Sequence, residues 1–314
     1  MKASDIKKVL IIGAGTMGRQ IGLQNALFGR DVTFYDLNED IFKVARTHIG
    51  KIAAGYVRGG YISEEMAASA LARISFTADI KEACADVNLV SESVPENVEL
   101  KQRVWGEFSK HLPVDAILTT NTSTLVPSMF ADATGHPERF LAWHFAFPVF
   151  IANIADVMPH AGTDQAVTDV MLDYSREVGL VPLYIKKEWP RYVYNEMFVA
   201  FLEAAQRLVV NEVARIEDID RAWMGIMGAP FGPFGIMDNV GLDTCLSVIK
   251  EHVNSDPSLL WGQEIIDFFQ AKVDAGELGR KSGQGFYTYP KPAYQQPGFL
   301  DRVVPKYKKQ ADRS

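Results

Sequence analysis

A glycine-rich segment near the start of the chain constrains the fold most strongly. Gly-Ala-Gly-Thr-Met-Gly at 13–18 directly follows the apolar run 9–12 and opens a stretch of helical character, 19–28. In a strand–turn–helix unit, the first glycine permits the tight turn, the second lets the backbone approach a pyrophosphate, and the third lets the helix pack close to the strand. The helix N-terminus presents its positive dipole end to the phosphates. We therefore predict a dinucleotide site that includes Gly13, Gly15, Thr16, Met17 and Gly18.

The acidic residue after the second predicted strand indicates which dinucleotide is bound. Asp36 follows the run 32–35, at the distance of about twenty residues from the glycines at which a carboxylate accepts from the ribose hydroxyls of the adenosine. A 2′-phosphate would be repelled by this carboxylate, and Leu37-Asn38 supplies no arginine to receive one. The sequence therefore favours NAD over NADP.

The distribution of apolar residues predicts an α/β domain followed by an all-α domain. Helical stretches separate six runs of β character, namely 9–12, 32–35, 87–90, 117–120, 141–145 and 181–185. This alternation is typical of a parallel sheet with crossover helices, a Rossmann-type doubly wound fold. The segment from about 40 to 75, rich in Ala, Glu, Lys and Arg, predicts two inserted helices. Beyond Trp189-Pro190 the apolar spacing becomes helical. We predict an NAD-binding domain at 1–187, a helical domain at 188–290 and a polar tail at 291–314.

Composition excludes several classes of partner. The 314 residues carry a net charge of −7, which works against nucleic acid, because binding there depends on clustered cations. Cys84 and Cys245 are far apart and form no metal-ligand motif, so neither a zinc site nor a disulfide is expected and a reducing cytoplasm fits. No uninterrupted apolar run reaches the roughly 18 residues that a membrane-spanning helix needs, and none resembles a signal peptide. We expect a soluble, cytoplasmic protein without a metal.

Among the six histidines, His144 is the best candidate for a general base. Histidine is the usual base near neutral pH. His144 ends the run 141–145 at the carboxyl edge of the predicted sheet, where open α/β sheets bind their ligands. Glu96 and Ser123 follow two other predicted strands. His160 follows a strand end at Pro159 but has no polar cluster nearby, and the remaining four appear incidental: His48, His111, His136 and His252.

These residues belong to a longer series of motifs. The chain resembles the L-3-hydroxyacyl-CoA dehydrogenase family, which also contains relatives that act on gulonate and carnitine. The resemblance covers nearly the whole chain. Its motifs are Gly-Ala-Gly-Thr-Met-Gly at 13–18, Val-Pro-Glu-Asn-Val-Glu-Leu-Lys at 94–101, Asn-Thr-Ser at 121–123, His-Phe at 144–145, Asn195, Gly-Pro-Phe-Gly at 232–235, Val-Gly-Leu-Asp-Thr at 240–244 and Gly-Arg-Lys-Ser-Gly-Gln-Gly-Phe-Tyr at 279–287.

The resemblance implies a role for each candidate residue. His144 would be the general base, Glu96 would pair with it, and Ser123 and Asn195 would hydrogen-bond the substrate oxygen. Lys101 matches a family lysine near the cofactor, which Glu96 and Ser123 would also contact. The implied reaction is the reversible, NAD-dependent oxidation of a 3-hydroxyacyl-CoA, with short chains favoured, as part of fatty acid metabolism. The family also implies a homodimer formed through the helical domain.

Two departures from the family pattern leave the substrate open. His-Phe-x-Asn-Pro appears here as His-Phe-Ala-Phe-Pro at 144–148, and Pro-Gly-Phe-x-x-Asn-Arg appears as Pro-Arg-Tyr-Val-Tyr-Asn-Glu at 190–196. The second change adds one cation and converts another to an anion. An acyl-CoA could place its phosphates on cations of the inserted helices: Lys43, Arg46, Lys51 and Arg58.

Two alternatives remain. The first is a dehydrogenase of a small free 3-hydroxy acid, similar to the gulonate and carnitine relatives, whose substrate carboxylate is bound by Arg191. The second is a non-catalytic NAD-binding or structural protein, since one fold can serve several functions. The presence of His144, Glu96, Ser123 and Asn195 together argues against this second alternative.

Overall fold

The chain divides into two compact units, Met1–Glu196 and Met197–Ser314. A computed structural model describes residues 1–255 and 261–300. The domain bounds predicted from the sequence, 1–187 and 188–290, remain predictions. Of the predicted tail at 291–314, residues 301–314 lie outside the described residues.

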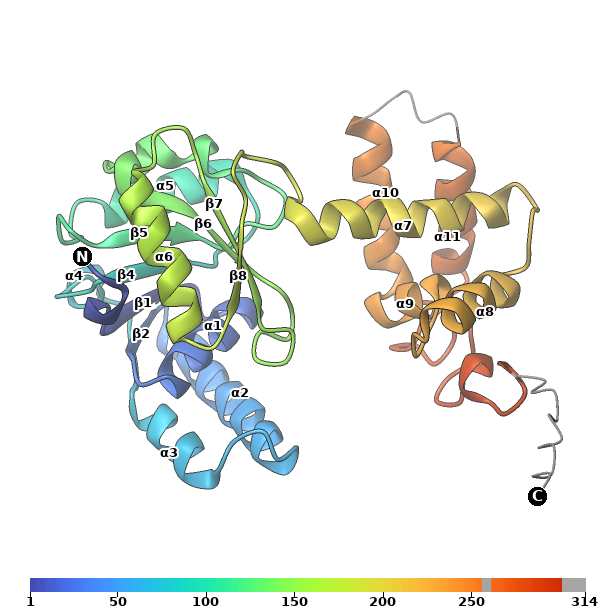
Figure 1. Cartoon of the computed structure of the whole chain (residues 1–314), viewed down its shortest axis with the longest axis horizontal. Coiled ribbons are helices and arrows are strands. Elements are labelled where there is room, and N and C mark those ends of the chain that lie inside the picture. Colours follow the sequence, from blue (N-terminus) through green and yellow to red (C-terminus); the bar gives the residue numbers. More distant parts are fainter. Residues whose placement is uncertain (256–260, 301–314) are drawn as a thin grey trace, which may run out of the picture. The chain divides into compact units, whose positions relative to one another are not determined.

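A single mixed sheet forms the centre of the first unit (Figure 1). In the described part of the chain, its eight strands have the order β3-β2-β1-β4-β5-β6-β7-β8. Strands β1 to β6 are parallel to one another, whereas β7 pairs antiparallel with β6 and β8 pairs parallel with β7. The strands are β1 (Lys8–Ile12), β2 (Asp31–Tyr35), β3 (Ile74–Thr77), β4 (Leu89–Glu92), β5 (Ile117–Thr120), β6 (Phe140–Phe145), β7 (Ile154–Pro159) and β8 (Val181–Tyr184). The predicted Rossmann-type fold is confirmed.

The sheet differs from the prediction in two strands and one direction. Neither β3 nor β7 is among the six predicted runs, and β4 lies two residues later than the run 87–90. β3 is a short strand at the sheet edge with only one buried residue, Thr77, so its apolar signal is weak. β7 carries a buried carboxylate, Asp156, in the middle of an otherwise apolar strand. The antiparallel β6–β7 pair brings the middle of β7 opposite the carboxyl end of β6.

Helices cover both faces of the sheet, and each face has its own apolar core. One core contains buried residues of α1 (Thr16–Leu27), α2 (Glu39–Arg58), α3 (Glu64–Ala72) and α6 (Gln165–Glu177). The other contains residues of α4 (Ile80–Ala83) and α5 (Val98–Phe108). The two predicted inserted helices are α2 and α3, which extend together beyond the sheet (Figure 1). Asn38 caps α2 and Ser63 caps α3, because their side chains accept from first-turn N–H groups.

The described part of the second unit is helical, as predicted. Helix α7 (Tyr192–Val210) begins in the first unit and is followed by α8 (Ile216–Met227), α9 (Pro233–Val240), α10 (Leu242–Ser255) and α11 (Gly262–Asp274). Short 3₁₀ helices elsewhere in the chain cover Ala3–Asp5, Pro127–Met129, Ala131–Thr134, Pro137–Arg139 and Ala293–Gln295. No helix of the described residues is long and apolar enough to cross a membrane.

Two buried aspartates explain the glycine-rich motifs of the second unit. Asp220 accepts from the N–H groups of Phe234 and Gly235, and Asp238 accepts from two N–H groups within 279–287. Burial raises the pKa of both carboxyl groups. A Cβ at Gly285 would lie 2.1 Å from the Asp238 carboxylate, so only glycine allows this approach. These motifs therefore build the core of the second unit.

The beginning of the predicted polar tail is packed rather than solvated. Tyr294 and Phe299 are buried in the apolar core of the second unit. The aromatic side chains account for this difference from the prediction, because their burial outweighs the polar character of the surrounding residues.

Candidate active site

The glycine turn after β1 has the local geometry that the sequence predicts. Gly13 has a φ of +103°, which favours glycine, and its N–H donates to the carbonyl oxygen of Tyr35. A Cβ at Gly18 would lie 2.0 Å from the carbonyl oxygen of Gly13. A Cβ at Gly15, in contrast, would meet no atom within 4 Å. Packing therefore requires Gly13 and Gly18, whereas the open space at Gly15 fits the approach of a phosphate group.

Asp36 lies against the same turn. One of its carboxylate oxygens accepts from the N–H of Ala14 at 2.8 Å, and the other accepts from Leu37. Thr16 begins α1, and Met17 packs partly buried against the core. These residues fit NAD: the turn and the N-terminus of α1 would hold the phosphates, and Asp36 would accept from the adenosine ribose.

A buried histidine–aspartate pair lies at the junction of β6 and β7. His144 and Asp156 are directly opposite each other in the antiparallel ladder. The Nδ1 atom of His144 is 2.9 Å from Asp156 Oδ2, and the two residues are 8% and 4% exposed. The carboxylate requires a proton on Nδ1, which leaves Nε2 as the acceptor nitrogen. The pair thus has the arrangement of a base and the group that orients it.

The carboxylate that contacts His144 is therefore not the predicted one. Glu96 instead accepts at one oxygen from the Thr122 hydroxyl and from the N–H groups of Ser123 and Thr124. Burial opposes ionisation of Glu96, but these hydrogen bonds and the charge of Lys101 lower its pKa below the usual value. Glu96 fixes the loop after β5, and this structural role corrects the expected pairing with His144.

Lys101 is one of the most deeply buried side chains of the first unit, rather than a surface lysine. Its side chain is 1% exposed, and Nζ lies 2.7 Å from Glu92 and 3.4 Å from Glu96. Glu92 also accepts from the Thr120 hydroxyl at 2.7 Å. Lys101 therefore links the ends of β4 and β5 to the loop that carries Ser123.

The start of α7 lies against His144. The ring of Tyr192 stacks on the imidazole with a centroid distance of 4.5 Å. Asn195 follows one helical turn later and is partly exposed. Arg191 forms an ion pair with Glu196, with 3.2 Å between Nε and the carboxylate. The two charge changes that distinguish this segment from the family pattern thus contact each other.

Asp156 and Tyr192 are the site residues that sequence reasoning missed. Asp156 gives one usable signal, since it is the only charged residue in the run 154–159. Four other histidines have partners for their side chains, namely His48, His136, His160 and His252. His160, for example, contacts the carbonyl oxygen of Pro137 and receives the N–H of Gly162.

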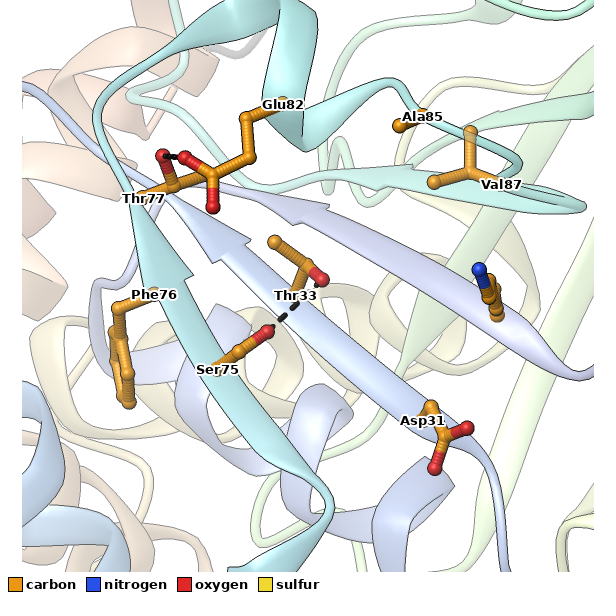
Figure 2. A pocket seen from close by; sticks show the side chains of 9 residues that line it. Asp31, Thr33, Ser75, Phe76, Thr77, Glu82, Ala85 and Val87 are labelled. Carbon is orange, nitrogen blue, oxygen red and sulfur yellow. Dashed lines mark hydrogen bonds between the residues drawn. The ribbon is translucent and has the colours of Figure 1, made fainter.

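A groove of about 240 Å³ lies elsewhere on the sheet, beside β2 and β3 (Figure 2). Two pairs of its polar side chains bond each other: Thr33 bonds Ser75, and the Thr77 hydroxyl donates to Glu82. None of its lining residues is a predicted site residue. The groove therefore gives no reason to move the candidate site from His144.

Comparisons with known proteins agree with this geometry. Residues 8–188 match the family model for the NAD-binding domain of 3-hydroxyacyl-CoA dehydrogenase, and residues 192–289 match that for its C-terminal domain. The chain is 32% identical over 288 residues to 3-hydroxybutyryl-CoA dehydrogenase of Bradyrhizobium diazoefficiens, covering 91% of this chain and 97% of the relative.

Two solved structures are also similar. A diketoreductase described for substrate-directed dual catalysis of dicarbonyl compounds has a TM-score of 0.83 and 36% identity, covering 90% of this chain and 99% of the other. An (S)-3-hydroxybutyryl-CoA dehydrogenase of Ralstonia eutropha has a TM-score of 0.80 and 27% identity, with the same coverage.

Proposed function

Because the chain belongs to the 3-hydroxyacyl-CoA dehydrogenase family, we propose that it oxidises a 3-hydroxyacyl-CoA reversibly to the 3-ketoacyl-CoA, with His144 as the general base. The observation that carries this proposal is the buried His144–Asp156 pair at the carboxyl end of β6. Residues 8–188 form the family's NAD-binding domain, and NAD is the cofactor.

The base acts through Nε2. Asp156 holds the proton on Nδ1, so Nε2 takes the proton of the substrate hydroxyl during oxidation and returns it during reduction. The imidazolium that forms is stabilised by the charge of Asp156. Bound NAD supplies the acceptor for the hydride that leaves the same carbon.

Other residues hold the substrate oxygen and the cofactor. Ser123 and Asn195 would donate hydrogen bonds to the oxygen whose charge changes during the reaction. Glu96 supports this role of Ser123, because it accepts from the Ser123 N–H at 2.8 Å. Lys101 and Glu96 would border the nicotinamide half of NAD, while Asp36 and the glycine turn hold the adenosine half.

A short-chain acyl-CoA is the preferred substrate. Relatives named 3-hydroxybutyryl-CoA dehydrogenase support it. On α2, Lys43 is exposed and pairs with Asp40, and Arg46 lies over the ring of Phe76. Such cations could still meet phosphate groups, since exposed ion pairs contribute little energy.

A small free 3-hydroxy acid is the alternative substrate, with its carboxylate on Arg191. The similarity to a diketoreductase that acts on dicarbonyl compounds favours keeping this alternative. The ion pair between Arg191 and Glu196 weakens it, because the guanidinium charge is already compensated.

The test is NADH oxidation with acetoacetyl-CoA beside a panel of free 3-keto acids. His144→Gln should lower kcat by roughly 100-fold or more, the loss expected without a general base, while the Kd for NADH is unchanged. Turnover of the thioester alone supports the acyl-CoA assignment, and turnover of free acids alone favours the alternative. Full activity in His144→Gln would remove this residue from the role of base. A wild-type protein that binds NADH but reduces neither class would favour a non-catalytic function.

A homodimer formed through the second unit is part of the proposal. That unit exposes large apolar side chains, including Ile226 at 83%, Val213 at 65% and Met197 at 62%. Apolar surface of this kind is typical of an interface between subunits. Light scattering during size-exclusion chromatography should give twice the mass of the 34.9 kDa chain. A monomer at micromolar concentration would contradict the dimer.

We also propose a reducing compartment, the cytoplasm, and a role in fatty acid metabolism. Cys84 and Cys245 are both free and buried, as suits a protein that does not depend on disulfides. Fractionation of the source cells tests the compartment, and a mitochondrial location would contradict it.

A further inference from the structure

The hydroxyl of Tyr192 is a buried polar group without a partner. Tyr192 is 1% exposed and packs against Ala142, Met158 and Ile185 of the first unit. Among the residues that the structure describes, no atom forms a hydrogen bond with its Oη. A buried hydroxyl without a partner is costly, so a folded protein that retains one usually has a use for it.

The ring that carries this hydroxyl contacts the candidate active site. The Tyr192 ring stacks on His144, with 29° between the two ring planes. The family pattern has phenylalanine at this place, so the hydroxyl is an addition that packing alone does not require. Burial, followed by the charges of Glu96 and Asp156, raises the pKa of Tyr192 well above its usual value. The group therefore stays protonated and acts as a hydrogen-bond donor.

The neighbouring carboxylates are largely occupied by other donors. Glu96 holds the loop at 122–124, Glu92 accepts from Lys101, and Glu188 accepts from the N–H of Ser128. Of the carboxylates whose charge acts on Tyr192, Asp156 keeps one buried oxygen, Oδ1, without a hydrogen-bond partner among the described residues. A donor that remains unused beside a general base is suited to an acceptor that arrives with the ligand.

We propose that Tyr192 donates a hydrogen bond to a second oxygen of the substrate, the carbonyl-type oxygen at C1 of a 3-keto thioester or acid. This inference rests on the proposed function and deepens it, because it assigns a specificity-determining residue to the same site. A site with a buried donor of this kind discriminates against ligands that lack the acceptor.

The variant Tyr192→Phe removes the hydroxyl and keeps the ring. We expect KM for acetoacetyl-CoA, or for the free 3-keto acid if that is the substrate, to rise about 10- to 100-fold, the cost of leaving one buried partner unsatisfied. The kcat and the Kd for NADH should stay within about twofold of the wild-type values, and the pH profile of kcat should be unchanged. The Tm should be unchanged or higher, because the free protein loses an unpartnered polar group. Tyr184→Phe, which removes the same atom from a tyrosine that is 41% exposed on β8, is the matched control.

Each other outcome contradicts the proposal in a recognisable way. A lower Tm with unchanged KM would mean that the hydroxyl is structural. A lower kcat with a shifted pH profile and unchanged KM would mean that it bonds Asp156 and acts on the base. A weaker Kd for NADH alone would assign the hydroxyl to the cofactor. Calorimetric titration of both substrate classes without turnover separates failure of this proposal from failure of the proposed function. If the wild type binds a 3-keto compound without reducing it, the affinities of the wild type and Tyr192→Phe can still be compared. If the wild type binds neither class, both proposals are overturned.

Discussion

Asp156→Asn tests the buried pair on which the proposed mechanism depends. The substitution keeps the size of the side chain and removes its charge. Asp156 Oδ1 has no partner among the described residues. The amide of the variant can therefore place its nitrogen where Oδ1 lies and keep its oxygen toward Nδ1 of His144. The correct tautomer of His144 then survives, so the variant isolates the effect of the charge.

The expected magnitude follows from the geometry. With 2.9 Å between Nδ1 and Oδ2, the two charge centres are about 4 Å apart. At an effective dielectric constant of about 20, this gives roughly 4 kcal/mol of stabilisation for the imidazolium. The predicted loss in kcat is therefore about 10³-fold. It is smaller than the loss of about 10⁴-fold known for a case in which the amide also changes the tautomer of the histidine. Folding should be little affected, because no backbone N–H group of the described residues donates to either carboxylate oxygen.

The assay is single-turnover NADH formation from 3-hydroxybutyryl-CoA at saturating NAD. Glu96→Gln is the matched comparison, since it neutralises the carboxylate that the sequence had assigned to His144. We expect Glu96→Gln to weaken NAD binding more than it slows this step. Activity of Asp156→Asn within threefold of wild type would refute the argument, and so would a 10³-fold loss in Glu96→Gln alone.

Three further predictions test other parts of the structure. Asp36→Ala should weaken NAD binding and relax discrimination against NADP, and an unchanged cofactor profile in fluorescence titrations would contradict the ribose assignment. The lowered pKa of Glu96 predicts that its ionised carboxylate stabilises the fold and that Glu96→Gln lacks this stabilisation. The stabilisation is present in full above the pKa of the unfolded state, about 4.3, and is lost as the pH falls through the lower pKa of the folded state. Urea unfolding of both proteins from pH 7 to pH 3 checks this, and a difference in unfolding free energy that does not change with pH would contradict it. Arg191 has a φ of +66°, so Arg191→Gly should be more stable than Arg191→Ala by about 1 kcal/mol. Equal urea midpoints for these two variants would contradict the backbone strain inferred at residue 191.

The local fold of the proposed nucleotide site could be predicted from the sequence because its parts are close together along the chain. A strand, three glycines, a helix and an acidic residue follow one another within 8–36, and local geometry fixes how they meet. The position of His144 at the end of a strand was predictable for the same reason. These features depend on turn conformation and strand direction, both of which leave local patterns in the sequence.

The partner of His144 could not be predicted in this way, because it depends on how two strands pair. The family resemblance implied Glu96, which follows the end of another predicted parallel strand. In the observed antiparallel pair, β7 instead places Asp156 directly opposite His144. The burial of Lys101 is a similar case, since it depends on Glu92, a residue that is only recognisable as a partner when the adjoining strand ends are in place.

The segment at 190–196 shows how departures from a family pattern can be read together. Arg191 at the family's glycine and Glu196 at its arginine form one ion pair, so the two new charges compensate each other. The argument that Arg191 binds a substrate carboxylate then loses most of its support, because it considered Arg191 without Glu196. Tyr192 differs from the family's phenylalanine only by its hydroxyl. It nevertheless leaves an unpartnered donor beside the base, and it is therefore the change in this segment with the greater consequence for substrate choice.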